Sequence, residues 1–192
     1  MGAVRVIDCE SRIAFEGGWV RCLEPGDVHD GYVSGLNDPE VNRYLVGVRL
    51  ATQTVAGVDA FVRQNREAPG ALLLGIWLDG SSRHSGTIRL HGIEHQNHTA
   101  HIGICLFDKA AWGKGIATRS IRAATSWALA ALGLRWIEAG VYEGNVASAK
   151  AFMSAGYAHV YDIPDKYLYD GRPIRVSVLA ARDHEFPSAV RK

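Results

Sequence analysis

Two glycines separated by one residue, Gly113 and Gly115, lie between a segment typical of a strand and a segment typical of a helix. Residues 99–106 upstream are apolar and β-branched, whereas small residues recur downstream at helical spacing over residues 117–131. The first turn of a helix presents backbone N–H groups without internal partners and carries partial positive charge. The junction therefore predicts an anion site built from the backbone amides of Gly113, Lys114, Gly115, Ile116, Ala117 and Thr118.

The spacing of this loop argues against the two common nucleotide motifs. A P-loop needs four residues between its first glycine and a Gly-Lys-Ser/Thr, and a dinucleotide fingerprint needs a third glycine where Arg119 stands. Because glycine has no Cβ, an oxygen-rich ligand can still approach the backbone, and Lys114 or the Thr118 hydroxyl would add a contact. The alternative is a glycine-rich turn that only lets the strand and the helix pack closely.

The elements that must position this loop follow from the apolar pattern of the chain. We expect strands at residues 19–23, 72–78, 86–93, 99–106, 134–141, 157–161 and 174–181. We expect helices at residues 28–36, after Asp38 with Pro39 as the first helical residue, at 53–66 and at 117–131. Strands followed by two helix–strand alternations predict an α/β (α+β) fold, with helices on both faces of a mixed sheet.

Composition predicts one domain and excludes several classes of partner. With 192 residues, of which 47% are hydrophobic, we expect a single domain over residues 18–183 and a tail at 184–192. Residues 1–17 have no clear periodicity and form an extension of unknown role, either a tail or an extra edge segment. A net charge of +1 argues against nucleic acid, and no apolar run reaches the ~18 residues that would cross a membrane. Three cysteines, an odd number, favour a reducing cytoplasm over a disulfide framework.

Two segments together resemble the GNAT superfamily of N-acetyltransferases, over roughly residues 18–182. Residues 110–115 match the superfamily's coenzyme A loop, Gln/Arg-x-x-Gly-x-Gly/Ala, except at the first position. Residues 145–157 match its Asn-x-x-Ser/Ala…Gly-Phe/Tyr segment. The sequences of residues 112–118 and 36–45 are most similar to the RimJ/RimL-type branch of the superfamily. That branch includes protein N-terminal acetyltransferases and enzymes that acetylate nucleotide-linked amino sugars.

The resemblance implies a fold and a co-substrate. It implies a mixed, mostly antiparallel sheet of six to seven strands with a V-shaped split between the fourth and fifth strands. Acetyl-CoA would bind with its pyrophosphate on the amides of residues 113–118 and with Asn145 reaching the pantetheine arm. Main-chain groups of Ile104, Cys105 and Leu106 would bond that arm as an added strand does.

The resemblance also places a candidate base in the fourth strand. His101 stands where many RimJ/RimL-like relatives have a Glu, and a neutral imidazole accepts a proton near neutral pH. The alternative is a satisfied polar residue that faces the third strand. His91 is its expected cross-strand neighbour, and His95 and His98 belong to the same predicted hairpin. We expect no metal there, because no nearby cysteine pairs with these histidines.

The pattern leaves two candidates for the group that protonates the leaving thiolate. Many superfamily members have a Tyr seven residues after the Asn that corresponds to Asn145, and this chain has Phe152 instead. Ser148 is the candidate acid or sulfur contact, one helical turn before Phe152. Its alternative role is that of an ordinary small helix residue, and water could also protonate a thiolate with a pKa of about 8.5.

The acceptor site is assigned from the resemblance alone, because no motif in the sequence identifies the acceptor. By resemblance, Arg43, Tyr44 and the segment 161–169, expected as a loop between the last two strands, would wall the acceptor site. We expect a small-molecule primary amine, for example a nucleotide-linked amino sugar. The alternatives are a protein N-terminus and a non-catalytic acyl-CoA-binding module, which the missing Tyr keeps open. A homodimer is compatible with the sequence but not specified by it.

Overall fold

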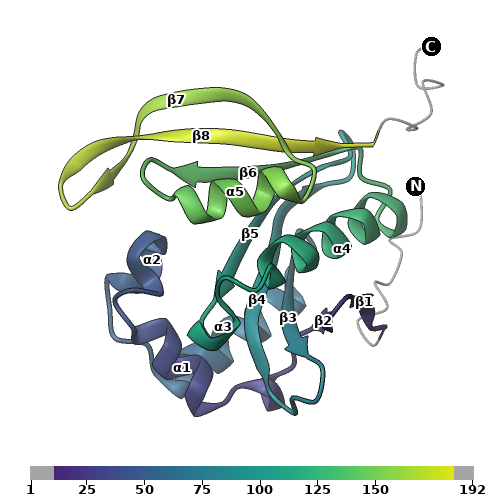
Figure 1. The fold of residues 1–192 in the computed structure, drawn as a ribbon, viewed down its shortest axis with the longest axis vertical. Helices are drawn as coiled ribbons and strands as arrows, with labels where there is room; N and C mark the ends of the chain where they lie inside the picture. Colours follow the sequence, from purple (N-terminus) through teal and green to yellow (C-terminus); the bar gives the residue numbers. More distant parts are fainter. Residues whose placement is uncertain (1–10, 184–192) are drawn as a thin grey trace.

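The computed structural model describes residues 11–183 as one open, eight-stranded sheet flanked by helices (Figure 1). The strand order is β1-β2-β3-β4-β5-β6-β8-β7, and every neighbouring pair is antiparallel except β5 and β6. The strands are β1 (Ile13–Phe15), β2 (Gly18–Cys22), β3 (Ala71–Leu78), β4 (His84–Glu94), β5 (Thr99–Leu106), β6 (Trp136–Tyr142), β7 (Ala158–Tyr169) and β8 (Arg172–Arg182).

Five α-helices and three short 3-10 helices complete the described part of the chain. The α-helices are α1 (Asp30–Asn37), α2 (Val46–Arg49), α3 (Val55–Glu67), α4 (Ile116–Ala131) and α5 (Val146–Ser154). The 3-10 helices are η1 (Pro25–Asp27), η2 (Asn42–Tyr44) and η3 (Lys109–Ala111). None of the helices within residues 11–183 combines the length and the apolar composition needed to span a bilayer.

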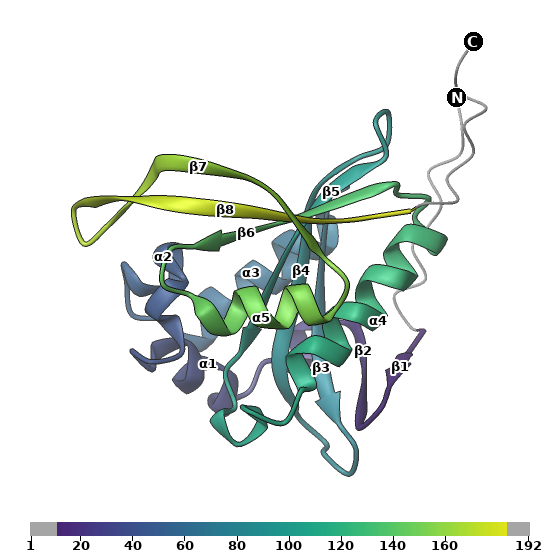
Figure 2. The ribbon, with the colours of Figure 1, turned by 45° about the horizontal axis from the view of Figure 1, so that its top comes forward.

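The sheet has helices on both faces, and the central strand β3 shows why. Leu72, Leu74 and Ile76 pack in the core beneath α4 and α5, whereas Leu73 and Trp77 pack beneath α1 and α3. Successive side chains of a strand point to opposite faces, so a strand that is apolar at almost every position needs a cover on both sides. Figure 2 shows α4 and α5 on the near face of the sheet and α3 behind it.

The sheet splits between β5 and β6. These two strands pair only from Thr99↔Trp136 to His101↔Glu138, whereas β4 pairs with β5 as far as Leu106. Within the described residues, the β6-facing edge of residues 102–106 therefore has no partner strand. This is the V-shaped split that the resemblance implied, and β5 and β6 are the fourth and fifth of the predicted strands.

The predicted fold is confirmed, and three details differ. Residues 13–15 add an eighth strand at the edge, while residues 1–10 and the predicted tail 184–192 lie outside the described part. The helix predicted after Asp38 was wrong, because the Asp38 carboxylate caps a turn by accepting the Glu40 N–H at 2.8 Å, and only η2 and the four-residue α2 follow. The loop predicted at residues 161–169 was also wrong, because β7 continues through it.

Candidate active site

The loop before α4 leaves backbone amides available to an anion. Gly113 and Gly115 have φ of 72° and 73°, and Gly115 is the N-cap of α4 in the left-handed conformation. The first helical bond runs from the Arg119 N–H to the Gly115 carbonyl at 3.1 Å, so the N–H groups of Ile116, Ala117 and Thr118 precede the helical ladder. Residues 112–115, Lys114 among them, are exposed. The predicted amide cradle is therefore open to a ligand.

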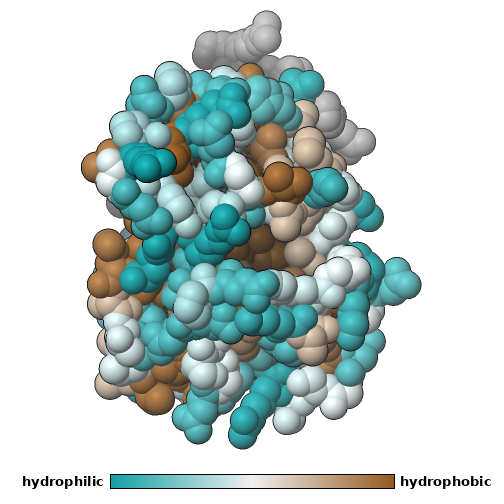
Figure 3. Space-filling model, turned by 60° about the vertical axis from the view of Figure 1, so that its left-hand side comes forward, coloured by the Kyte–Doolittle hydropathy of each residue, from teal (hydrophilic) through white to brown (hydrophobic). Residues whose placement is uncertain are grey.

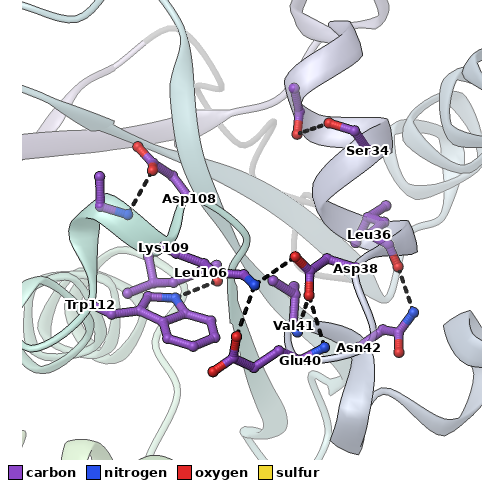
Figure 4. Close-up of polar contacts among 12 residues, drawn as sticks. Ser34, Leu36, Asp38, Glu40, Val41, Asn42, Leu106, Asp108, Lys109 and Trp112 are labelled. Carbon is purple, nitrogen blue, oxygen red and sulfur yellow. Dashed lines mark hydrogen bonds and ion pairs between the residues drawn. The ribbon is translucent and has the colours of Figure 1, made fainter.

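Two side chains hold this loop in place. The Arg119 guanidinium donates to the Glu16 carbonyl at 2.7 Å and to the Lys114 carbonyl at 3.0 Å. The Trp112 indole donates to the Leu106 carbonyl at 2.9 Å and fastens the loop to the end of β5 (Figure 4). In the sequence, Arg119 is only a departure from the dinucleotide fingerprint, and its contacts with Glu16 and Lys114 arise only in the folded chain.

The unpaired edge of β5 leads directly into this loop. Ile104 and Leu106 pack against the core under α4 and α5, whereas the Cys105 side chain points toward α1, where burial raises the pKa of its thiol to about 12. A thiol with that pKa remains protonated at neutral pH. Because the main-chain groups of successive strand residues point to alternate edges, only every second residue of this stretch can offer its groups to the split, and the Leu106 carbonyl is already occupied by Trp112.

Asn145 lies across the split from β5, between β6 and α5. Its side-chain oxygen accepts the Ser148 N–H at 3.3 Å and so caps α5. Among residues 11–183, no group is bonded to the Asn145 amide nitrogen, which remains available to donate. Ser148 is partly exposed in the first turn of α5. One turn later, Phe152 is only 2% exposed and its ring packs against Tyr157, so the position of the missing Tyr belongs to the core.

His101 is the last residue of β5 that pairs with β6, at the vertex of the split. Its side chain is 54% exposed, and its Nδ1 lies 3.8 Å from a carboxylate oxygen of Glu138. The expected cross-strand neighbour is in place, since the rings of His91 and His101 stack with centroids 5.4 Å apart. Burial, followed by Arg89 and His101, lowers the pKa of His91. This arrangement favours a neutral His91 beside His101.

Glu138 is the residue at this vertex that sequence reasoning missed. The Trp136 indole donates to Glu138 Oε1 at 2.8 Å, and the other carboxylate oxygen, Oε2, faces His101. A carboxylate beside an imidazole orients the ring. Only the parallel pairing of β5 with β6 brings the two residues together, and Glu138 had no motif of its own.

The segment around η2 faces the hairpin β7–β8 over the mouth of the split. The rings of Tyr44 and Tyr169 lie 6.0 Å apart, and Arg49 bonds Asp170 at 2.8 Å. Tyr142, at the end of β6, meets Tyr167 edge-on at 5.4 Å. The fold therefore brings together the two predicted walls of the acceptor site. One wall is Arg43 and Tyr44, and the other is formed by the tyrosines of residues 161–169. Figure 3 shows that this face of the molecule is hollowed, with hydrophobic residues on the floor of the hollow.

An ion cluster ties the same segment to the cofactor loop. Lys109, in η3, lies 2.7 Å from an Asp38 oxygen and 2.8 Å from a Glu40 oxygen (Figure 4). Hydrogen bonds from Lys109 lower the pKa of Asp38, and Asp38 raises that of Lys109. The segment 38–49 therefore contacts both sides of the split. No group of three or more metal-ligating side chains gathers anywhere within residues 11–183.

Comparison with known proteins assigns this architecture to a family. A family model described as an acetyltransferase (GNAT) domain matches residues 19–158. The chain belongs to the GNAT family of acetyltransferases. It is therefore an acyltransferase of the N-acetyltransferase type, and acetyltransferases of this family use acetyl-CoA.

Relatives of this acetyltransferase span most of its length. The uncharacterized N-acetyltransferase YoaA of Bacillus subtilis is 27% identical over 146 residues, which cover 74% of this chain and 81% of YoaA. The structure of spermidine N-acetyltransferase from Vibrio cholerae, in complex with CoA and spermine, superposes with a TM-score of 0.78 at 16% identity, covering 89% of this chain and 98% of that one. RimL, a ribosomal L7/L12 α-N-protein acetyltransferase in complex with CoA, superposes with a TM-score of 0.77 at 16% identity, covering 90% and 98%. At these identities the two structures show the shared fold alone.

Proposed function

We propose that this protein transfers an acetyl group from acetyl-CoA to the primary amine of a small, anionic molecule, for example a nucleotide-linked amino sugar. Binding of acetyl-CoA is supported by the unpaired edge of β5, which runs into the free amides of Ile116, Ala117 and Thr118. An extended pantetheine arm suits such an edge, and a pyrophosphate suits such amides. Nothing within 4 Å would meet a Cβ at Gly113, so there is space for a ligand beside the backbone there.

The acceptor side of the proposal rests on charge. Arg43 lies over the Tyr44 ring at 5.3 Å and Lys166 over the Tyr167 ring at 5.3 Å, and neither has an acidic partner within residues 11–183. A rim of tyrosines with uncompensated cations favours an acceptor that carries negative charge and a stackable ring. The same cations would repel a polyamine. This is the reason to favour an anionic acceptor although a structural neighbour is a spermidine acetyltransferase.

The proposed chemistry assigns one proton transfer to each side of the split. Acetyl-CoA supplies the acyl group as a thioester. An alkyl ammonium has a pKa of about 10.4, so the acceptor must lose a proton before its nitrogen can attack. In the proposal His101 accepts that proton at its imidazole while Glu138 orients the ring. Ser148, in the first turn of α5, contacts or protonates the departing sulfur, and bulk water is the alternative proton donor.

A free-thiol release assay with a panel of amines tests the proposal. The panel contains nucleotide-linked amino sugars, peptides with free N-termini, polyamines and aminoglycosides, each with acetyl-CoA. We expect the highest kcat/KM with a nucleotide-linked amino sugar. We expect Arg43→Gln and Lys166→Gln to lower kcat/KM for that acceptor by about tenfold each, since each removes a charge-assisted contact. The control Arg63→Gln, on the outer face of α3, should have no effect.

Three outcomes would contradict parts of the proposal. A highest kcat/KM with a peptide would favour the protein N-terminal alternative, and one with a polyamine would refute the anionic acceptor. Tight acetyl-CoA binding without thiol release from any amine would refute turnover by this chain.

A further inference from the structure

A second hollow lies between α1 and the start of β4, beside the residues that follow the end of β5. Its volume is about 520 Å³, and none of the predicted cofactor, catalytic or acceptor residues lines it. One wall is the α1 face of Gly31, Ser34, Gly35 and Asp38, at helical spacing, where the missing side chain of Gly35 lets Phe107 pack against the helix. Phe107 supplies an apolar wall.

The floor of this pocket contains a buried histidine without hydrogen-bond partners. His84 is 2% exposed, and within the described residues neither its Nδ1 nor its Nε2 has a partner. The rings of His29, Tyr32, Trp77 and Phe107 surround it at centroid distances of 4.8, 4.8, 5.4 and 5.1 Å. A neutral imidazole has one donor and one acceptor, and leaving both unused in a buried position is costly. Both ring nitrogens therefore keep hydrogen-bonding capacity that the described residues do not use.

Most of the other polar groups in the lining already have partners. His29 accepts the Tyr32 N–H at Nδ1, and its Nε2 meets the His84 carbonyl at 3.2 Å. Asp38 is paired with Lys109, and Asp108 accepts the Ala110 N–H and the Ser85 hydroxyl. Arg83 is exposed, and its guanidinium has no hydrogen-bond or ion-pair partner within residues 11–183. The groups with free hydrogen-bonding capacity are thus the Arg83 guanidinium at the mouth of the pocket and the His84 imidazole on its floor.

We propose that this pocket binds a small organic anion through a carboxylate or phosphate group, with Arg83 at the mouth and His84 on the floor. A guanidinium bonds either group with two parallel hydrogen bonds, and the ligand's remaining atoms rest against Phe107 and the glycine face of α1. The site shares no residue with the proposed acetyl transfer, and its test does not use acetylation as a readout.

Nuclear magnetic resonance of the histidine rings of the full chain tests the site. The Cε1–H resonances of His84 and His29 are followed while inorganic phosphate, or in a separate titration sodium acetate, replaces sodium chloride at constant ionic strength. His84→Phe, which keeps an aromatic ring in the cage, identifies the His84 resonance by its loss. We expect a saturable shift of both resonances with at least one of the two anions.

The variant Arg83→Gln decides between a built site and a nonspecific effect of salt. Because Arg83 is exposed, the substitution leaves the fold intact, and we expect it to weaken the apparent Kd by about tenfold. The control Arg63→Gln, another exposed arginine, should leave the Kd unchanged. A shift with phosphate alone identifies a phosphate ligand, and a shift with acetate alone identifies a carboxylate. No saturable shift with either anion, or an identical titration in Arg83→Gln, would overturn the proposal.

Discussion

At the scale of single residues, the vertex of the split gives the sharpest prediction. His101→Ala removes the proposed base but leaves the amide cradle before α4 untouched. A general base contributes roughly 100-fold or more to turnover, so we expect kcat at pH 7 to fall by about that factor while the KM for acetyl-CoA stays near that of the parent. Steady-state kinetics from pH 6 to 9 provide the measurement.

The hairpin between β4 and β5 offers a matched control for that variant. His95→Ala removes an exposed imidazole from the same hairpin, and its kinetics should equal those of the parent. Glu138→Gln keeps the side-chain shape beside His101 and should lower kcat less than His101→Ala does. Equal activity of His101→Ala and the parent across the whole pH range would dismiss His101 as the base.

A second prediction at this scale concerns the backbone of the cofactor loop. Gly115 has φ of 73°, and a Cβ at this position would come within 2.8 Å of the Arg119 guanidinium. Gly115→Ala should therefore distort the cradle at a cost of about 1 kcal/mol or more, and weaken acetyl-CoA binding about tenfold in calorimetry. Gly26→Ala is the control, because φ is ordinary there and nothing lies within 4 Å of its Cβ position. Unchanged affinity in Gly115→Ala would show that the loop does not use this geometry.

At the scale of elements, the hairpin β7–β8 controls one wall of the proposed acceptor site. Its turn is Asp170-Gly171, two residues with φ of 50° and 76°, which are the signs that a type I′ turn requires. Gly171→Ala disfavours this turn by about 1 kcal/mol or more and should move Tyr169 away from Tyr44. We expect a higher KM for the acceptor and an unchanged Kd for acetyl-CoA.

The companion variant Asp170→Gly separates turn geometry from charge. Glycine keeps the left-handed turn but removes the ion pair with Arg49, in which Asp170 is 63% exposed. Exposed pairs of this kind contribute at most about 1 kcal/mol, so we expect a smaller effect on the acceptor KM than from Gly171→Ala. If Asp170→Gly raised the acceptor KM more than Gly171→Ala did, the ion pair with Arg49, and not the turn geometry, would determine the position of this wall of the acceptor site.

The same elements show how far the sequence alone could lead. The loop at Gly113 and Gly115, and most strands and helices, follow from local periodicity and glycine positions. The dipeptide Asp170-Gly171 is a local hairpin signal that the sequence analysis overlooked, and it would have predicted a longer β7. By contrast, the pairing of His101 with Glu138 and the cluster of Lys109 with Asp38 join residues that are distant along the chain. Contacts of that kind depend on the sheet order, which no local pattern specifies.

At the scale of the whole molecule, the histidines under α1 make stability depend on pH. Burial, with a smaller effect of His29, lowers the pKa of His84 to about 3, and burial also lowers that of His29. The unfolded chain takes up protons on both rings near pH 6.5, whereas the folded protein does not. The folded state therefore has its full stability above pH 6.5 and loses it progressively as the pH falls toward 3.

The window between pH 6.5 and 5 separates the histidines from the carboxylates, because carboxylates with ordinary pKa values near 4 are still largely ionised there. His91, whose pKa burial also lowers, contributes in the same window, so the variants of His84 and His29 are needed to assign the effect. Linkage for His84 alone predicts that the free energy of unfolding decreases by about 1.5 kcal/mol across this window, measured by urea denaturation at half-unit steps. His84→Phe should flatten this dependence by about that amount. If that variant does not fold, His29→Asn, which keeps a side chain suited to capping α1, should flatten it by a smaller amount. A parent stability that is constant from pH 6.5 to 5 would mean that the α1 layer opens and hydrates His84 without cost, contrary to its packed ring cage.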